Sequence, residues 1–296
     1  MHIRRFLTIV STIFLFVVST ALQAQTRRAL VVGIGKQEDK AWGKINGDKD
    51  VSYVLEMLKK AKYRSIATLV NSQATKANIV SAFKQLAGRC KNGDVVYVHF
   101  SGHGQQMKDI HNDEKDGLDE CWIPYDAYRK PCKKDRGEKH LTDDEVNYYL
   151  NAVRNKIGDA GKMLVVIDAC HSGGATRGDD DEVVRGVEDI FDAIKSFIWG
   201  TDKAKVDVNP DAQVNKERWI TISACESDQV NIEMKSPAVG KLTYAIYNKV
   251  KEAMGNDNDD FFRRIRMFVN SNTGSRPQYP VMTGETDRYR ITDIIQ

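Results

Sequence analysis

Short apolar runs rich in β-branched residues recur along the chain and alternate with segments of helical periodicity. These runs predict buried strands at residues 29–34, 66–70, 95–100, 163–167 and 219–223. Apolar residues spaced three and four apart predict amphipathic helices at residues 50–62, 75–89, 143–156, 242–253 and 261–270. The alternation is typical of a doubly wound α/β domain, in which functional side chains gather beyond the carboxyl ends of parallel strands.

The alternation stops between residues 173 and 217. This segment opens on two glycines, carries an acidic run from Asp179 to Glu182, and contains basic residues that include Arg177 and Arg185. A weak helical pattern at 188–199 is its only periodic part. Because a segment of this length without a packed core is usually functional or disordered, we expect a long mobile loop here.

Residues 1–24 have the organisation of a secretory signal peptide. A basic start with Arg4 and Arg5 precedes an apolar run at 6–18, which is short for a hydrocarbon core of about 30 Å. We expect cleavage after Ala24 and export to the periplasm, the cell surface or the medium, leaving residues 25–296 as one domain. An uncleaved membrane anchor is the alternative, because Leu22 is not the small residue usually found at that position.

Loss of the first 24 residues would lower the formal net charge from +3 to +1. A charge this small gives no support to nucleic-acid binding. The content of 41% apolar and 29% charged residues is ordinary for a globular chain, and no second membrane-spanning candidate follows the signal. We therefore expect no membrane partner after cleavage, while the oligomeric state stays open.

The five cysteines are scattered without a C-x-x-C pair, so the sequence indicates neither a zinc site nor a thioredoxin-type motif. At least one of them stays unpaired within the chain, and the other four could form disulfides in three ways. A free thiol is a liability in an oxidising compartment. This favours one cysteine that is kept for its reactivity.

Two predicted strands end in residues that suit nucleophilic catalysis. The strand at 95–100 leads into Ser101, Gly102, His103 and Gly104, and the strand at 163–167 leads into Asp168 and Cys170. Neighbouring parallel strands lie about 5 Å apart, so an imidazole at one end could activate a thiol at the other. We predict Cys170 as nucleophile, His103 as general base, and the N–H groups of Gly104 and Cys170 as the oxyanion hole. The alternative is a loop histidine beside a buried, inert cysteine.

Four ordered motifs, at residues 97–104, 116–126, 168–173 and 223–229, resemble those of the caspase-like cysteine peptidase clan. The similarity is closer to metacaspases and their bacterial relatives than to animal caspases. It covers residues 27–228, with weaker support at 278–280. The resemblance implies a caspase-haemoglobinase fold, with a mostly parallel central sheet flanked by helices, and a Cys–His dyad without an obligatory third member.

The residue before the Ala-Cys pair separates this chain from animal caspases, which carry Gln-Ala-Cys. Asp168 stands at that position and would repel an aspartate at substrate position P1 while attracting lysine or arginine. The resemblance implies that Asp168, Ser101 and Asp50 line the S1 pocket. Two alternatives remain: Asp50 as a helix cap, and Asp168 as a strand-end carboxylate satisfied by backbone N–H groups.

Acidic residues also raise the question of Ca²⁺, which prefers several converging oxygen ligands. No cofactor is required for the chemistry, but many metacaspases are activated by calcium. The resemblance places Asp119, Asp143 and Asp144 at ligand positions, and Asp179 is a further candidate. The alternative is a solvated acidic face at the start of a helix begun by Thr142.

Together these features predict a cysteine endopeptidase that cleaves protein or peptide substrates after Arg or Lys. Arg177 and Arg185 follow the nucleophile within the expected loop, so self-cleavage there is a natural extension. We expect the strand at 219–223 to form one wall of the cleft and to offer an edge to an extended peptide. The alternatives are a catalytically silent binding or scaffold protein and a cysteine hydrolase of another bond, such as a transpeptidase.

Overall fold

The structure is a computed structural model of the 296-residue chain. It describes residues 25–109, 114, 117–170, 182–186, 217–227, 229–252, 255, 257–271 and 277–296. The predicted signal peptide at 1–24, most of the loop expected at 173–217, Arg177 and Asp179 lie outside the described residues. No helix in the described part is both long and apolar enough to cross a bilayer.

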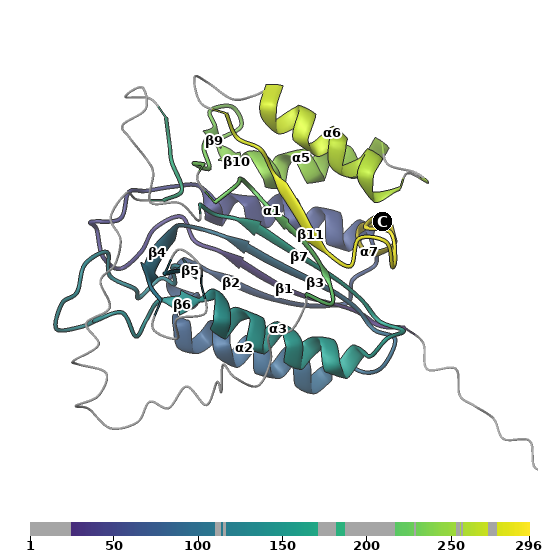
Figure 1. Ribbon diagram of the computed structural model, residues 1–296, viewed down its shortest axis with the longest axis horizontal. Helices are drawn as coiled ribbons and strands as arrows, with labels where there is room; N and C mark the ends of the chain where they lie inside the picture. Colours follow the sequence, from purple (N-terminus) through teal and green to yellow (C-terminus); the bar gives the residue numbers. More distant parts are fainter. Residues whose placement is uncertain are drawn as a thin grey trace, which may run out of the picture.

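A six-stranded sheet in the order β11-β8-β7-β3-β1-β2 forms the centre of the molecule (Figure 1). Its strands are β1 (Arg27–Gly33), β2 (Ser65–Val70), β3 (Val95–Ser101), β7 (Lys162–Asp168), β8 (Ile220–Ser223) and β11 (Val281–Gly284). All of these strands except β11 pair in parallel, and these five correspond to the five predicted strands. The antiparallel edge strand β11 was not predicted, because its four residues are half-buried or exposed and carry no apolar run.

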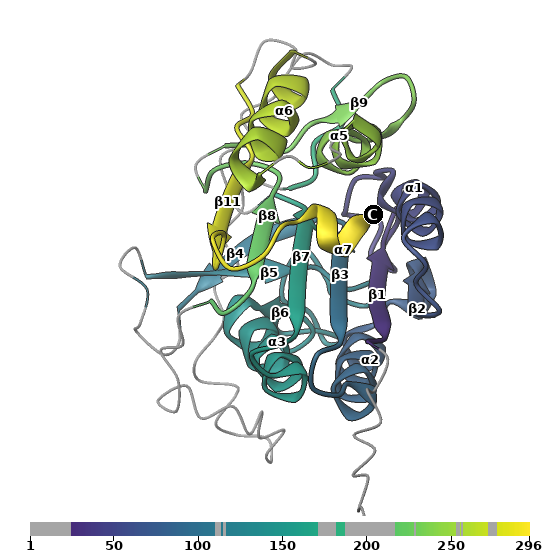
Figure 2. The same ribbon diagram turned by 90° about the vertical axis from the view of Figure 1, so that its right-hand side faces the viewer.

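Helices cover both faces of this sheet (Figure 2). On one face lie α2 (Lys76–Arg89) and α3 (Asp143–Ile157), and on the other lie α1 (Gly47–Lys60), α5 (Lys241–Lys249), α6 (Asn258–Ser271) and the short α7 (Thr292–Ile295). Single-turn 3₁₀ helices occur at Asn71–Gln73 and Val250–Glu252. The predicted α/β class with a mostly parallel sheet is confirmed.

Strand β3 shows why the buried strands have apolar residues in succession. Val96, Val98 and Phe100 pack into the core beneath α2 and α3, whereas Val95 and Tyr97 pack into the core beneath α1, α5 and α6. Successive side chains of a strand point to opposite faces, and both faces of this sheet are covered. An uninterrupted apolar run is therefore what a central strand requires.

Helix starts are set by local capping. Thr142 caps α3 by accepting a hydrogen bond from the Glu145 amide at 3.3 Å, and the Glu145 carboxylate accepts one from the Thr142 amide at 3.2 Å. Helix α1 begins at Gly47, three residues earlier than predicted, with Asn46 at the cap position. Asp50 lies inside the first turn and makes no cap, so the helix-cap alternative for Asp50 is wrong.

Two small antiparallel units were not predicted. One is a three-stranded sheet of β4 (Gly104–Lys108), β5 (Leu118–Trp122) and β6 (Leu141–Thr142), and the other is a hairpin of β9 (Glu233–Met234) and β10 (Val239–Gly240). Their strands are two to five residues long and mix polar with apolar side chains, so periodicity could not reveal them. All five cysteines are described and all carry free thiols, so no disulfide links any of them.

Candidate active site

The two strand ends that carry the predicted dyad lie side by side. Strands β3 and β7 pair Ser101 with Asp168, and the Gly102 amide donates to the Asp168 carbonyl oxygen at 3.3 Å. His103 and Cys170 each follow two residues beyond this pair, with exposed fractions of 1% and 0%. Parallel pairing therefore brings the predicted base and nucleophile to the same edge of the sheet.

The His103 ring is held by the loop before α1. Its Nε2 donates to the Gly43 carbonyl oxygen at 2.7 Å, and the ring centroid lies 5.1 Å from that of Trp42. The buried Nδ1 has no hydrogen-bond partner in the part of the chain that the structure describes. Burial lowers the pKa of His103 to about 4, so the ring is neutral near pH 7 and Nδ1 offers a free lone pair.

The Cys170 sulfur receives a hydrogen bond from the backbone. The Asn231 amide donates to Sγ, with the two atoms 2.8 Å apart. A donor at this position stabilises negative charge on sulfur, which is the charge that a nucleophilic thiolate carries. The cysteine is thus placed among polar backbone groups instead of a purely apolar core, which argues against an inert buried thiol.

The two predicted oxyanion donors converge on one oxygen atom. The amides of Gly104 and Cys170 both donate to the Arg185 carbonyl oxygen, each at 3.1 Å. A side chain at position 104 would place its Cβ 1.6 Å from the Cys170 carbonyl oxygen, so the close approach requires glycine. The prediction that these two N–H groups act together agrees with their geometry.

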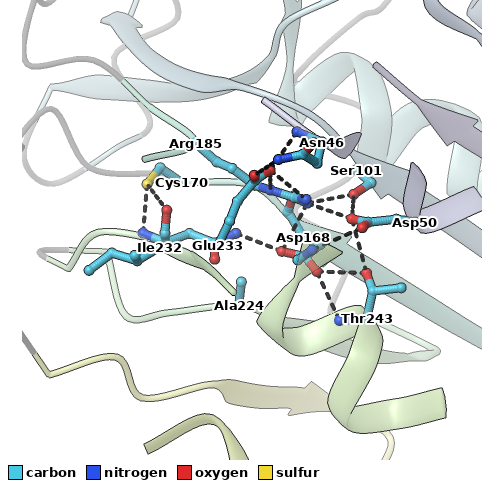
Figure 3. A network of polar contacts seen from close by, with 12 residues as sticks. Asn46, Asp50, Ser101, Asp168, Cys170, Arg185, Ala224, Ile232, Glu233 and Thr243 are labelled. Atoms are coloured by element: carbon cyan, nitrogen blue, oxygen red, sulfur yellow. Dashed lines mark hydrogen bonds and ion pairs between the residues drawn. The ribbon is translucent and has the colours of Figure 1, made fainter. Parts of the chain in front are cut away.

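The Arg185 side chain meets all three residues predicted for the S1 pocket (Figure 3). Its Nη1 lies 2.7 Å from Asp50 Oδ2 and 3.2 Å from Asp168 Oδ1, and it donates to Ser101 Oγ at 2.6 Å. The guanidinium and both carboxylates are fully buried. The structure therefore brings Asp50, Ser101 and Asp168 together around an arginine of the same chain.

Asp168 is fixed as an anion by several donors. Its Oδ2 accepts from the amide and hydroxyl of Thr243 at 2.8 and 2.6 Å, and its Oδ1 accepts from Asn231 Nδ2 at 2.7 Å. Burial works to raise the pKa of Asp168, but Arg185 and these hydrogen bonds outweigh burial and hold the pKa below its usual range. The alternative, in which backbone N–H groups satisfy the Asp168 carboxylate, is wrong, because side chains supply most of its hydrogen-bond donors.

Asp50 is also held by several donors, but its pKa shifts in the opposite direction. Its Oδ1 accepts from the Gly240 amide at 2.9 Å, and its Oδ2 accepts from the Ser101 hydroxyl. Burial raises the pKa of Asp50 to about 6, although Arg185 acts in the opposite direction. The two carboxylates on the same nitrogen thus differ in how firmly they hold their charge.

A third carboxylate, not predicted from the sequence, faces the other side of the guanidinium. Glu233 Oε1 accepts from Arg185 Nε at 2.9 Å and lies 2.9 Å from Nη2. The Asn46 amide donates to the same oxygen at 2.7 Å, and Asn46 Nδ2 donates to Oε2. Glu233 follows the last predicted strand by ten residues, and no local pattern distinguishes it from a surface glutamate.

Residues 183–185 lie as an extended strand against residues 231–233. The Arg185 amide donates to the Asn231 carbonyl oxygen and the Glu233 amide to the Val183 carbonyl oxygen, both at 2.9 Å, with Val184 opposite Ile232. This geometry is that of a peptide added to a strand edge. The edge differs from the predicted one: β8 is paired on both sides, by β7 and β11, so residues 219–223 offer no free edge.

Comparison with known sequences assigns the fold family. A family model described as the caspase domain matches residues 26–289, which is most of the chain. The chain belongs to the caspase-domain family. The resemblance to the caspase-like clan that the sequence motifs indicated is therefore confirmed.

Relatives of this caspase-domain protein include metacaspases. Metacaspase-1A of Aspergillus oryzae is 33% identical over 158 residues, which are 51% of this chain and 35% of the relative. Metacaspase-2 of Arabidopsis thaliana is 27% identical over 241 residues, covering 77% of this chain and 53% of the relative. The chain thus spans about a third to a half of the length of these two relatives.

Solved structures support the same fold. Protein GSU0716 from Geobacter sulfurreducens has a TM-score of 0.61 at 19% identity, covering 92% of this chain and 100% of that chain. Caspase-1 from Spodoptera frugiperda has a TM-score of 0.55 at 12% identity, covering 88% of this chain and 87% of that chain. At these identities the similarity establishes the caspase fold alone.

The acidic residues predicted to bind calcium lie on neighbouring elements of this caspase domain. Asp119 is on β5, while Asp143 and Asp144 open α3 directly after β6, which pairs with β5. Burial, followed by Glu120 and Asp119, raises the pKa of Asp143 to about 8. Its buried Oδ1 has no hydrogen-bond partner among the described residues, so a purely solvated acidic face does not describe this carboxylate.

A complete metal shell is not present in the described part of the chain. No group of three or more acidic, histidine or cysteine side chains there is arranged to hold an ion. Asp179, the fourth predicted ligand, lies outside the described residues. Calcium binding therefore stays a prediction, supported at this stage by the environment of Asp143 alone.

Proposed function

We propose that this protein is an exported cysteine endopeptidase that cleaves after arginine or lysine and processes itself between Arg185 and Gly186. One observation carries the proposal: Arg185 places its guanidinium among buried carboxylates and its carbonyl oxygen between two N–H donors. This is how a substrate with a basic P1 residue would lie in a peptidase site. Of the two arginines predicted as self-cleavage sites, the proposal selects Arg185.

The chemistry begins with a proton transfer. His103 Nδ1 takes the proton of the Cys170 thiol, and Sγ attacks the Arg185 carbonyl carbon, whose π electrons move to oxygen. The negative oxygen then receives the hydrogen bonds of the Gly104 and Cys170 amides, which already point at it. The hydrogen bond from His103 Nε2 to Gly43 keeps Nδ1 free for this step.

The second half releases both products. The C–N bond breaks, and the Gly186 nitrogen leaves with the proton from His103. Water then attacks the thioester between Cys170 and Arg185 while His103 accepts a proton from that water. The Arg185 carboxylate departs, and the thiol is restored.

Intact mass of the purified protein tests self-processing. The wild-type chain is expected to give two fragments whose masses place the cut between Arg185 and Gly186, whereas Cys170→Ala stays whole. Arg177→Ala is the matched control, because it removes a nearby arginine of the same segment and should leave the cut at Arg185 unchanged. A wild-type protein with the same single mass as Cys170→Ala would overturn the self-processing proposal.

Peptide hydrolysis tests the activity separately. Fluorogenic peptides ending in Arg or Lys should be cleaved by the wild type and not by Cys170→Ala. An irreversible arginyl inhibitor directed at thiols should label the wild type at Cys170. Equal turnover by both proteins would overturn the assignment of Cys170 as the nucleophile, whereas a site that takes no label would favour the alternative of a catalytically silent binding protein. Product analysis with an added amine acceptor separates hydrolysis from transpeptidation.

We propose Ca²⁺ as an activator of this enzyme, with no part in the bond-breaking chemistry. The support is the buried Oδ1 of Asp143, which has no hydrogen-bond partner among the described residues, and a pKa that is raised first by burial and then by the neighbouring carboxylates of Glu120 and Asp119. A bound cation would supply the missing positive charge. Self-processing should be faster in Ca²⁺ than in chelator, and Asp143→Asn should lose this difference; equal rates in both conditions would contradict it.

Export is supported by the sequence of residues 1–24. Expression of the full chain in a bacterial host should yield a mature protein beginning at Gln25 outside the cytoplasm. The Cys170→Ala background prevents the proposed self-cleavage from complicating the measurement. An intact amino terminus retained in the membrane fraction would favour the uncleaved anchor instead.

A further inference from the structure

The guanidinium of Arg185 is bound by two separate sets of acceptors. Nη1 faces Asp50, Asp168 and the Ser101 hydroxyl, which are the residues expected for any basic P1 side chain. Nε and Nη2 face Glu233, on the opposite side of the group. In Figure 3 the Glu233 side chain approaches Arg185 from the side away from Asp50. The pocket therefore contacts all three guanidinium nitrogens.

The Glu233 carboxylate is also held in place by groups other than Arg185. Its two oxygens accept hydrogen bonds from the backbone and side-chain amides of Asn46, directly before α1. Glu233 itself is 4% exposed, so its charge is largely removed from water. Its own amide pairs with the Val183 carbonyl oxygen in the strand that carries Arg185. The hairpin β9–β10 and the start of α1 thus fix its position relative to the bound peptide.

A lysine in the same pocket would pair with only one of the two sets of acceptors, either Asp50 and Asp168 or Glu233. Lysine has a methylene group at the position of the arginine Nε, and a single ammonium at its end in place of a planar fork of donors. With the ammonium at Asp50 and Asp168, no donor would reach Glu233 Oε1 along the side chain. The buried Glu233 carboxylate would then keep its hydrogen bonds from Asn46 but lack a positively charged partner, which is strongly unfavourable.

We propose that Glu233 is a specificity residue that selects arginine over lysine at P1. This inference rests on the proposed peptidase function and narrows its substrate class to chains with arginine before the cleaved bond. Asp50 and Asp168 attract a positive charge of either kind, whereas Glu233 distinguishes the two side chains. The expected preference is on the order of 100-fold in kcat/KM, since a buried hydrogen-bonding group is left unpaired by the wrong substrate.

Paired peptides that differ only in Arg or Lys at P1 test this role. Glu233→Gln removes the charge while keeping the size of the side chain, so the Arg:Lys ratio of kcat/KM should fall at least about tenfold, mainly through lost arginine turnover. Asp168→Asn is the matched control, because it lies on the shared side of the pocket and should lower both activities together. Titration of Cys170 with the arginyl inhibitor corrects each rate for the fraction of competent sites.

A second variant covers the case in which Glu233→Gln does not fold. Asn46→Ala removes one hydrogen bond from the Glu233 carboxylate without touching the substrate, and it should lower the ratio to a smaller extent. An unchanged ratio in every folded variant, with the wild type active on arginine peptides, would overturn the role of Glu233 and leave the proposed function standing. A wild type that cleaves neither peptide would overturn the proposed function and the selectivity together.

Discussion

Three carboxylates and one guanidinium share the centre of the site, so Arg185 does not neutralise the negative charge around it. Asp50, Asp168 and Glu233 all lie within ion-pair distance of the same side chain, and all are buried. Isolated buried charges are costly, and removing one partner of a buried pair exposes that cost. The arginine is thus a stabilising part of the uncleaved protein.

Replacing Arg185 should therefore destabilise the uncleaved chain. In a Cys170→Ala background, Arg185→Ala should lower the free energy of unfolding by about 3 kcal/mol, because three carboxylates lose their cation. Urea denaturation measures the change, with Arg177→Ala as the control at a second arginine. Equal stability of the two variants would contradict the ion-pair interpretation.

Gly186 has too little space for a side chain. An added Cβ would lie 2.6 Å from the Cys170 Cβ and 3.0 Å from Sγ. Gly186→Ala should push the peptide bond away from the sulfur and slow self-processing by roughly 100-fold, since small displacements of reacting atoms are costly.

The rate of fragment formation, followed by intact mass, measures the effect of Gly186→Ala. Gly88→Ala is a suitable control, because nothing lies within 4 Å of the added Cβ on α2. Processing of Gly186→Ala at the wild-type rate would show that the bond lies elsewhere during the reaction.

At the level of elements, the long strands and helices were predictable, whereas the short strands were not. Strand β3 is buried on both faces and needs seven successive buried residues, which leaves a clear apolar run in the sequence. Strand β9 has two residues and is held by its pairing with β10 and by the residues around Glu233. Such an element exists because of its neighbours, and its own composition carries no signal.

The start of α3 offers a test of local capping. Thr142→Ala removes the hydroxyl that accepts from the Glu145 amide and should lower the free energy of unfolding by about 1 kcal/mol. Urea denaturation of the Cys170→Ala protein measures the loss. Thr75→Ala, which removes the corresponding cap of α2, should give a similar or smaller loss. No measurable loss at Thr142 would mean that tertiary contacts alone hold this end of α3.

At the scale of the whole molecule, buried histidines link stability to pH. Burial lowers the pKa of His99 and His103 to about 4 and that of His140 to about 3, against 6.5 when unfolded. Between pH 4 and 6.5 the unfolded chain binds protons that these folded side chains do not, so stability should rise with pH through this window. The pKa values of Asp50 and Asp143 are raised to about 6 and 8 and have the opposite effect on stability. The three histidines outnumber these two carboxylates, so we expect their effect to prevail.

Urea denaturation of the uncleaved Cys170→Ala protein at several pH values tests this balance. The midpoint should fall as the pH is lowered from 6.5 towards 4, because the histidines must then be protonated on unfolding. Using the uncleaved protein keeps Arg185 in place throughout. A midpoint that is constant or rises towards acid would contradict the prediction that the buried histidines outweigh Asp50 and Asp143 in this pH range.

The sequence by itself determined the parallel sheet, its main helices and the candidates Cys170, His103, Asp168 and Asp50, because buried strands and strand-end motifs are local patterns. Only the tertiary structure decided which other residues complete the site around these candidates. Glu233 comes from a two-residue strand, and Arg185 comes from a segment with no periodicity, yet both are buried in the site, where Arg185 contacts Asp168 and Glu233 contacts Arg185. Their positions depend on long-range pairing between residues 183–185 and 231–233, and pairing of that kind leaves no spacing for a linear pattern to reveal.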